Sequence, residues 1–313
     1  MPTTQITLLK KYGLEIRGFR GQHLLVDPNI QRKIVEGVDP KPKEWILEIG
    51  PGLGALTAEL LAAGACVIAV EKDKRFSEIL EGELGADYRG KLRIENADIL
   101  KTDLRKLLTR LSSLRASRSG AKQSQRLLRL RQSTLADPRN DVKLKVVSNL
   151  PYYITSPVLF WLIANRSHVE RAILMMQREV ADRLLAQPGD KDYGRLTLAL
   201  RYYAEVHHAF DVSRNCFTPK PDVDSSVITI DFHPPSQFPK GLDESFLFHL
   251  IQVAFGARRK TLLNRLSHDS KIGRSRDEVL KILQKLGIPE TARGEELLLK
   301  DFLSLAETLA KNP

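Results

Sequence analysis

The residues that point most clearly to a reaction are four consecutive ones, Asn149-Leu150-Pro151-Tyr152, which follow a short apolar run. The Asn149 side-chain oxygen and the Leu150 carbonyl could together accept both hydrogens of one amino group on a base. That would favour a pyramidal nitrogen whose lone pair points outward, toward a methyl donor. Pro151 stiffens the turn and has no N–H to compete, and Tyr152 offers a flat face for stacking. The cluster predicts methyl transfer to a base amino group, and a turn formed by chance at a strand end is the alternative.

A glycine-rich loop lies upstream, where residues 48–54 read Glu-Ile-Gly-Pro-Gly-Leu-Gly between a predicted strand and a predicted helix. Glycines allow a tight turn and a close approach to a ligand, and a helix N-terminus offers free N–H groups. Gly50, Gly52 and Ala55 also satisfy a dinucleotide-binding fingerprint. A nicotinamide dehydrogenase and a loop without a ligand are therefore alternatives to the methyltransferase interpretation.

Two acids follow the next two predicted strands. Because the carboxyl ends of neighbouring parallel strands line one crevice, Glu71 and Asp98 are expected side by side. Glu71 would accept from ribose hydroxyls and Asp98 from an adenine amino group. Taken alone, Glu71 with Lys72 fits a surface ion pair, and Asp98 fits the N-cap of a helix. Transfer from a sulfonium donor needs no strong acid or base, so positioning and electrostatics would carry the rate.

These segments together resemble the KsgA/RsmA family of rRNA adenine-N6,N6-dimethyltransferases, which use S-adenosyl-L-methionine (SAM). The resemblance runs from about Gly21 to Leu266. Residues 22–27, Gln-His-Leu-Leu-Val-Asp, are similar to the family segment that lies over the cofactor. Further similar segments are 177–183, 193–196, 217–225 and 255–262.

The resemblance implies an α/β fold: a doubly wound, mostly parallel, Rossmann-like sheet with a small helical C-terminal domain. It implies transfer of two methyl groups to each of two adjacent adenosines near the 3′ end of small-subunit rRNA, during ribosome assembly. The residues that it assigns to the cofactor are Gln22, His23, Leu25, Glu48, Gly50, Gly52, Gly54, Glu71, Lys72, Asp98 and Asn149.

The resemblance also implies substrate contacts. Phe217 would be a second aromatic wall of the base pocket, opposite Tyr152, with a core or loop aromatic as the alternative. Arg258, Arg259 and Lys260 would contact RNA phosphates, with a solvated helix end as the alternative.

Three departures from the family pattern stand out. Ser148 precedes the catalytic Asn where Gly or Ala is common, His23 replaces a commoner Asn, and the spacing from Asp98 to Asn149 is longer than usual. The extra length is the basic stretch 104–141, which has ten basic and two acidic residues. We expect it to emerge at the amino-end rim of the sheet, either as an auxiliary phosphate contact or as a solvated insertion.

The elements that must position these residues follow from apolar runs and turn residues. Expected strands are Trp45–Ile49, Cys66–Glu71, Leu92–Glu95, Leu144–Ser148, Arg171–Met176, Thr197–Tyr203 and Ser226–Phe232. Expected helices are Ala55–Ala63, Ser156–Ala164, Glu244–Phe255, Arg258–Leu266, Arg276–Leu286 and Glu295–Lys311. A proline-rich linker, 233–241, separates a methyltransferase domain, 1–233, from a helical domain, 242–313.

Composition favours a polyanionic partner. The 313 residues include 49 Lys and Arg against 38 Asp and Glu, a net charge of +11. The two cysteines, Cys66 and Cys216, exclude a disulfide framework and a Cys-rich zinc site, and no histidine spacing suggests a metal. The longest apolar run, Pro157–Ala164, is too short to cross a bilayer. We expect a cytoplasmic protein without metal, acting as a monomer on small-subunit rRNA.

Two further classes compete with this expectation. Macrolide-resistance methylases, which act on large-subunit rRNA, share the cofactor motifs, but the segments 217–225 and 258–262 favour the small-subunit family. A non-enzymatic assembly factor could keep the same fold. Intact Asn149 and Tyr152 favour retained activity.

Overall fold

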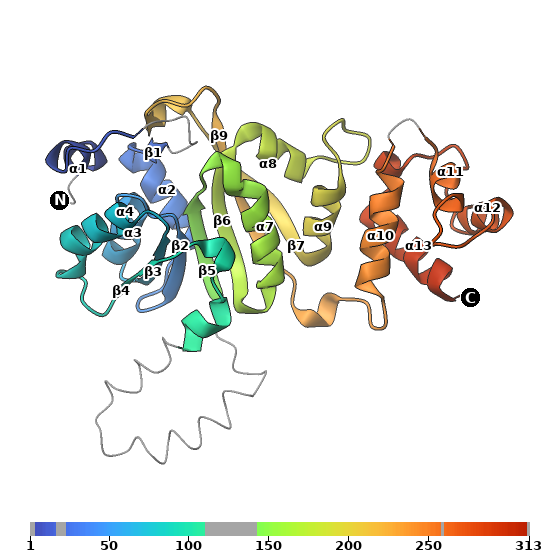
Figure 1. The fold of residues 1–313 in the computed structure, drawn as a ribbon, viewed down its shortest axis with the longest axis horizontal. Coiled ribbons are helices and arrows are strands. Elements are labelled where there is room, and N and C mark those ends of the chain that lie inside the picture. Colours follow the sequence, from blue (N-terminus) through green and yellow to red (C-terminus); the bar gives the residue numbers. More distant parts are fainter. Residues whose placement is uncertain (1–3, 17–22, 110–142, 258–259, 312–313) are drawn as a thin grey trace, which may run out of the picture. The chain divides into compact units, whose positions relative to one another are not determined.

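The computed structural model describes residues 4–16, 23–109, 143–257 and 260–311. Its centre is a seven-stranded sheet in the order β4-β3-β2-β5-β6-β9-β7 (Figure 1). The strands are β2 (Trp45–Ile49), β3 (Cys66–Glu71), β4 (Leu92–Asn96), β5 (Leu144–Asn149), β6 (Val169–Gln177), β7 (Ala204–Val212) and β9 (Ser225–Phe232). The strands from β4 to β6 are parallel and β9 is antiparallel to β6. The expected doubly wound, mostly parallel α/β sheet is confirmed.

The strand order reverses between β2 and β5. From β2 the chain adds β3 and β4 on one side, then returns to add β5 and β6 on the other. Ligands of open α/β sheets bind outside the carboxyl ends of the strands at such a switch point. Glu48 pairs with Val147 across β2 and β5, so the glycine loop and Asn149 leave the sheet at the same level.

Helices cover the sheet because its central strands are apolar on both faces; all six residues of β3 are buried. On one face Ile46, Val67 and Val147 belong to a hydrophobic cluster with residues of α2 and α3. Figure 1 shows α7 in front of β5 and β6. The helices of this part are α1 (Gln5–Lys11), α2 (Pro28–Val38), α3 (Ala55–Ala62), α4 (Lys74–Leu80) and α7 (Thr155–Ala164).

A second, two-stranded sheet ties the N-terminal segment to a distant part of the chain. β1 (Leu24–Leu25) pairs antiparallel with β8 (Phe217–Thr218). The pairing continues with a hydrogen bond from the Val26 N–H to the Cys216 carbonyl, at 2.8 Å. This ladder fixes His23, the residue before β1, near the carboxyl end of β5.

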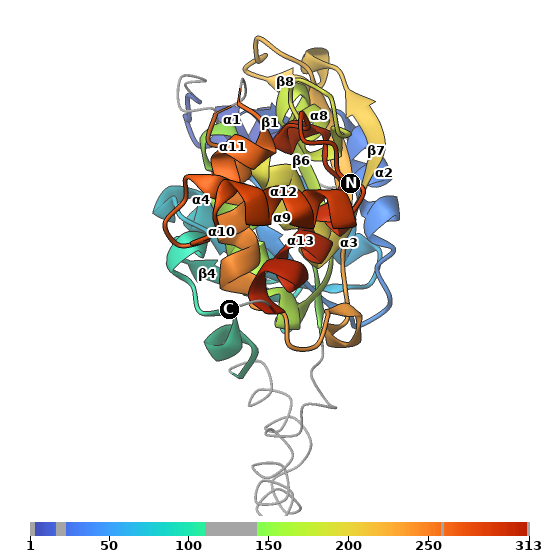
Figure 2. The same ribbon diagram turned by 90° about the vertical axis from the view of Figure 1, so that its right-hand side faces the viewer.

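The described residues form two compact units: those up to 178 with 207–232, and those of 179–206 with 233–311. The division expected from the sequence, 1–233 and 242–313, stays a prediction; contacts group residues 179–206 with the C-terminal helices. The helices that lie wholly or mainly in this second unit are α8 (Arg178–Leu185), α9 (Arg195–Tyr203), α10 (Glu244–Ala254), α11 (Leu262–Ser267), α12 (Arg276–Lys285) and α13 (Leu299–Lys311). α9 contacts α10 and α13, and Figure 2 shows the C-terminal helices facing the viewer.

One expected strand is wrong: Thr197–Tyr203 lies in helix α9. The Thr197 hydroxyl accepts from the Gly194 N–H at 3.3 Å and donates to the Arg183 carbonyl at 2.8 Å. These bonds fix the first turn of a helix, and the edge strand β7 starts only at Ala204. The helix expected from 258 begins at Leu262, where the Thr261 hydroxyl accepts from the Asn264 N–H.

The other expected elements are present with shifts of a few residues at their ends. Within the described ranges, no helix is both long and apolar enough to cross a membrane.

Candidate active site

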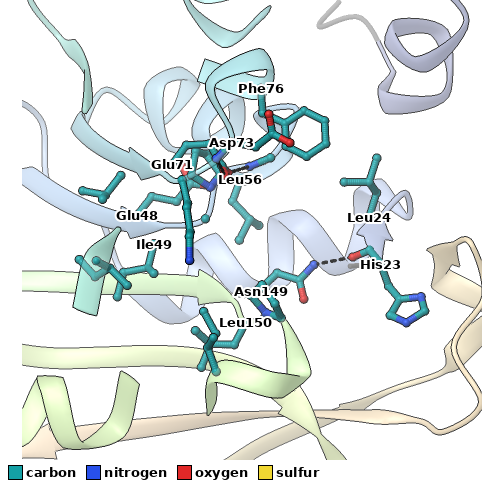
Figure 3. A pocket seen from close by; sticks show the side chains of 18 of the residues that line it. His23, Leu24, Glu48, Ile49, Leu56, Glu71, Asp73, Phe76, Asn149 and Leu150 are labelled. Carbon is teal, nitrogen blue, oxygen red and sulfur yellow. Dashed lines mark hydrogen bonds between the residues drawn. The ribbon is translucent and has the colours of Figure 1, made fainter. Parts of the chain in front are cut away.

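A pocket of about 530 Å³ lies at the carboxyl ends of the parallel strands (Figure 3). Its size falls within the range of small-molecule sites. The predicted site residues that line it are His23, Leu25, Glu48, Gly50, Gly52, Glu71, Lys72, Asp98, Asn149, Leu150, Pro151 and Tyr152. Folding therefore brings together residues that the sequence separates by more than a hundred positions.

The glycine loop has backbone angles that only glycine adopts without strain. Gly50, Gly52 and Gly54 have φ values of +67°, +56° and +82°. A Cβ on Gly54 would lie 2.4 Å from the Leu80 side chain, whereas a Cβ on Gly50 would meet nothing within 4 Å. Gly54 thus turns the chain into α3 without lining the pocket, and Gly50 leaves the loop open to a ligand.

The two acids at the ends of β2 and β3 are buried beside the loop. Glu71 accepts from the Gly52 N–H at 3.1 Å and from the Asp73 N–H at 2.8 Å. Burial raises the pKa of Glu71 despite these bonds. Glu48 is 2% exposed and accepts from the Thr57 hydroxyl. Burial raises the pKa of Glu48 to about 7, and the neighbouring Glu71 adds to the rise.

Asp98 does both things that its sequence position allowed. It accepts from the Leu100 N–H at 3.1 Å as an N-cap, and it lines the pocket. Its carboxylate also lies 3.1 Å from the Lys72 ammonium. Partial burial would raise the pKa of Asp98, but the hydrogen bonds from Lys72 and Leu100 outweigh it and lower that pKa. Asp98 is therefore a carboxylate acceptor at the pocket wall.

The turn after β5 is held on three sides. The Asn149 amide nitrogen donates to the His23 carbonyl at 3.0 Å (Figure 3). The Leu150 N–H donates to the Met175 carbonyl on β6 at 3.0 Å, and the Ser148 hydroxyl donates to the Ile49 carbonyl at 2.6 Å. Because the Asn149 amide nitrogen donates to the His23 carbonyl, the side-chain oxygen of Asn149 is left to accept a hydrogen bond from a ligand.

Tyr152 is fixed as a half-buried ring at the same wall. Its hydroxyl lies 3.0 Å from the Ser225 hydroxyl, and its ring centroid lies 5.4 Å from that of His23. The imidazole of His23 is in turn 2.7 Å from the Pro219 carbonyl. Burial raises the pKa of Tyr152, so the phenol stays neutral at physiological pH and presents an aromatic face rather than a charge.

Some predicted site residues lie elsewhere. Phe217 is 4% exposed, packs in the core cluster with Leu25 and Val227, and does not line the pocket. Its role as a wall of the base pocket stays a prediction. Lys260 is exposed just before α11. Gln22, Arg258 and Arg259 lie outside the described residues.

The sequence reasoning missed several wall residues. Gln5 and Ile16 come from the N-terminal segment, and the Gln5 amide donates to the Leu25 carbonyl; no motif marks either position. Ile99 and Leu100 follow Asp98 directly, so the prediction that Asp98 lines the pocket could have been extended to these two neighbours. Among the described residues, no three His, Cys, Asp or Glu side chains are placed to hold a metal together.

Comparison with known proteins agrees with this geometry. The family model described as ribosomal RNA adenine dimethylase matches residues 13–311. The chain belongs to the ribosomal RNA adenine dimethylase family. A relative of this dimethylase family from Moorella thermoacetica, named ribosomal RNA small subunit methyltransferase A, is 37% identical over 98% of this chain and 97% of its own. A second, from Geobacillus kaustophilus and of the same name, is 37% identical over 97% and 94%.

Two solved structures share this fold. A dimethyladenosine transferase from Plasmodium falciparum is similar with a TM-score of 0.72 and 25% identity, over 92% of this chain and 98% of that one. The 23S rRNA methyltransferase ErmE shares the fold with a TM-score of 0.65 and 22% identity, over 92% and 99%.

The residues of this adenine dimethylase fit the family's cofactor, SAM. Gly50 leaves space where a side chain would intrude. Glu71 and Asp98 present carboxyl oxygens at neighbouring strand ends of the pocket. These groups match the hydroxyls of a ribose and the amino group of an adenine, respectively.

Proposed function

We propose that this protein dimethylates the N6 amino groups of two adjacent adenosines near the 3′ end of small-subunit rRNA, with SAM as methyl donor, during ribosome assembly. The orientation of Asn149 is the observation that carries the proposal. Its nitrogen is committed to the His23 carbonyl, so its oxygen is left for a substrate N–H. A hydride-transfer enzyme has no use for such an acceptor beside an aromatic ring.

The residues of the turn act by positioning. The Asn149 oxygen and the Leu150 carbonyl each accept one hydrogen of the adenine amino group, and Tyr152 stacks on the base. When bound, SAM supplies an electrophilic methyl group on a sulfonium. With its two hydrogens held by these oxygens, the amino nitrogen would direct its lone pair toward that methyl group, and the proton lost from the nitrogen would pass to solvent. No strong base is needed, because the neutral thioether that would depart from the sulfonium is a good leaving group and orientation supplies the rate.

Recognition of the RNA rests on charge outside the pocket. The net charge of +11 favours a polyanion, and exposed Lys260 with Arg258 and Arg259 are proposed phosphate contacts. We further propose that the protein acts as a monomer in the cytoplasm, where small subunits are assembled.

The deciding experiment uses purified protein, isotopically labelled SAM and two substrates: undermethylated small ribosomal subunits and large subunits. We expect label only in small-subunit RNA, as N6,N6-dimethyladenosine at two adjacent positions. Label in large-subunit RNA would assign the protein to a resistance-methylase activity instead. SAM binding without transfer to either substrate would favour a binding factor.

A further inference from the structure

Two exposed apolar side chains stand at the mouth of the active-site pocket. Tyr153 is 61% exposed and Leu100 is 38% exposed, and both line the pocket. Tyr153 follows Tyr152 within one short 3₁₀ turn, Tyr152–Ile154. Tyr152 is half-buried and held by Ser225, so consecutive rings in this turn have different surroundings: one at the pocket wall and one in solvent.

When a base is flipped out into the pocket, the neighbouring base needs a new stacking partner at the pocket mouth. Extruding an adenosine into a pocket removes it from the stack and leaves its neighbour without a stacking partner. An exposed aromatic ring at the pocket mouth replaces that partner, because every base has a face that can stack on a ring. Lys72 also lines the pocket and its side chain is 70% exposed, which suits an anionic strand passing the mouth.

We propose that Tyr153 is the stacking platform for the nucleotide that adjoins the target adenosine. The inference rests on the proposed RNA substrate and deepens it, since it assigns to this chain a residue for the flanking nucleotide besides those that hold the target base. Leu100 extends the same apolar rim. Tyr153 contributes to RNA affinity, and it contributes nothing to SAM affinity.

The test compares Tyr153→Ala and Tyr153→Phe with wild type on undermethylated small subunits. We expect Tyr153→Ala to raise KM for the subunit by roughly 5- to 150-fold, as the removal of one base–aromatic stack predicts. SAM affinity and the salt dependence of KM should stay unchanged, because an uncharged phenol neutralises no phosphate. Tyr153→Phe should behave as wild type. Phe160→Ala is the matched control, because Phe160 is 56% exposed on α7 and does not line the pocket. The KM of this variant for the small subunit should equal that of the wild type.

Several outcomes would overturn the inference. An unchanged KM in Tyr153→Ala means that the ring stacks on nothing, and weaker SAM binding in that variant makes Tyr153 a wall of the cofactor site. A Phe variant as impaired as the Ala variant assigns the effect to the hydroxyl, and a rise in KM with Phe160→Ala makes it a general surface effect. Failure of the wild-type protein to methylate small subunits would instead reject the proposed function.

Discussion

At the scale of single residues, the site depends on one amide with a defined orientation. The His23 carbonyl holds the Asn149 nitrogen at 3.0 Å, and His23 is itself held by the β1–β8 ladder and by the Pro219 carbonyl. Such preorganisation is worth most where an interaction must be present only as the transition state forms.

Asn149→Ala should therefore lower kcat for RNA methylation at least a hundredfold, while SAM affinity changes only a few-fold. Single-turnover methylation and equilibrium binding of SAM measure the two effects. Asn165→Ala is a matched control, because the Asn165 amide also donates to a backbone carbonyl, that of Trp161, but lies outside the pocket. Normal turnover in the Asn149 variant would contradict the assigned role of its oxygen.

Glu48 should make stability depend on pH. Burial raises its pKa from 4.5 to about 7 in the folded protein, so the folded state keeps the proton to higher pH than the unfolded chain. The contribution of protonated Glu48 to the free energy of unfolding is fully present below pH 4.5 and is lost as pH rises through about 7. Glu48→Gln keeps an acceptor for Thr57 and removes the titration.

Urea unfolding of the cofactor-free protein between pH 4.5 and 8 measures this effect. Relative to Glu48→Gln, the wild-type free energy of unfolding should fall by about 3 kcal/mol across that range. Parallel pH profiles for the two proteins would show that folding does not raise the pKa of Glu48 above its value in the unfolded chain.

Sequence reasoning worked best for residues at the ends of strands. Glu71 and Asn149 end β3 and β5, and Asp98 lies two residues after β4; all three could be placed because parallel strands share one carboxyl edge. Phe217 could not be placed in the same way. It lies in a two-residue strand, where an aromatic ring can face the core or a ligand with the same local sequence.

At the scale of elements, the glycine loop gives a graded prediction. Gly54→Ala should destabilise the protein by about 3 kcal/mol, because it combines a positive φ with a contact of 2.4 Å to the buried Leu80. Gly50→Ala has the positive φ alone and should cost about 1 kcal/mol. Gly37→Ala, within α2 and with free space around it, should be neutral or stabilising by up to about 1 kcal/mol.

Urea unfolding midpoints of the three variants test this order. Equal losses for Gly54→Ala and Gly50→Ala would mean that Leu80 moves aside freely. SAM binding separates stability from function, since Gly50 lines the pocket and Gly54 does not. A Cβ at Gly50 should therefore weaken SAM binding despite its smaller effect on folding.

Sequence reasoning misassigned the segment 197–212 for two physical reasons. In β7, Ala204–Val212, most side chains are exposed or half-exposed, including two adjacent histidines, so the strand has no apolar run. The segment before it has buried residues at positions 197, 198, 200, 202 and 203. Over seven residues that pattern fits a strand as well as a helix. In the structure, the Thr197 hydroxyl accepts from the Gly194 N–H and donates to the Arg183 carbonyl, and these bonds fix the first turn of the helix.

At the scale of the whole molecule, charge and chemistry are separated along the chain. Residues 116–140 have six basic residues and one acidic residue and lie outside the described residues. The chain enters β5 at Leu144 and reaches Asn149 at its other end, five steps of roughly 3.3 Å or about 17 Å away. The chain therefore enters β5 at the end of the sheet opposite the pocket.

Deleting residues 116–140 should leave SAM affinity unchanged and weaken RNA binding. The dependence of RNA affinity on salt should become less steep by about one unit of log–log slope for each phosphate that the stretch neutralises. Filter binding of small-subunit RNA at several salt concentrations measures the slope, and calorimetry measures SAM affinity. Loss of SAM binding would place the stretch near the pocket instead.

The hydrogen bond between Asn149 and His23 joins two pocket residues that lie far apart in the sequence. A carbonyl near the N-terminus aligns an amide that is made more than a hundred residues later. A truncated or half-folded chain can thus carry every catalytic side chain and still present the amide in either rotation. The Asn149 oxygen is oriented for a substrate only after the segment with His23 has folded against the end of β5. A chain that has not completed this step therefore has no oriented acceptor for the base.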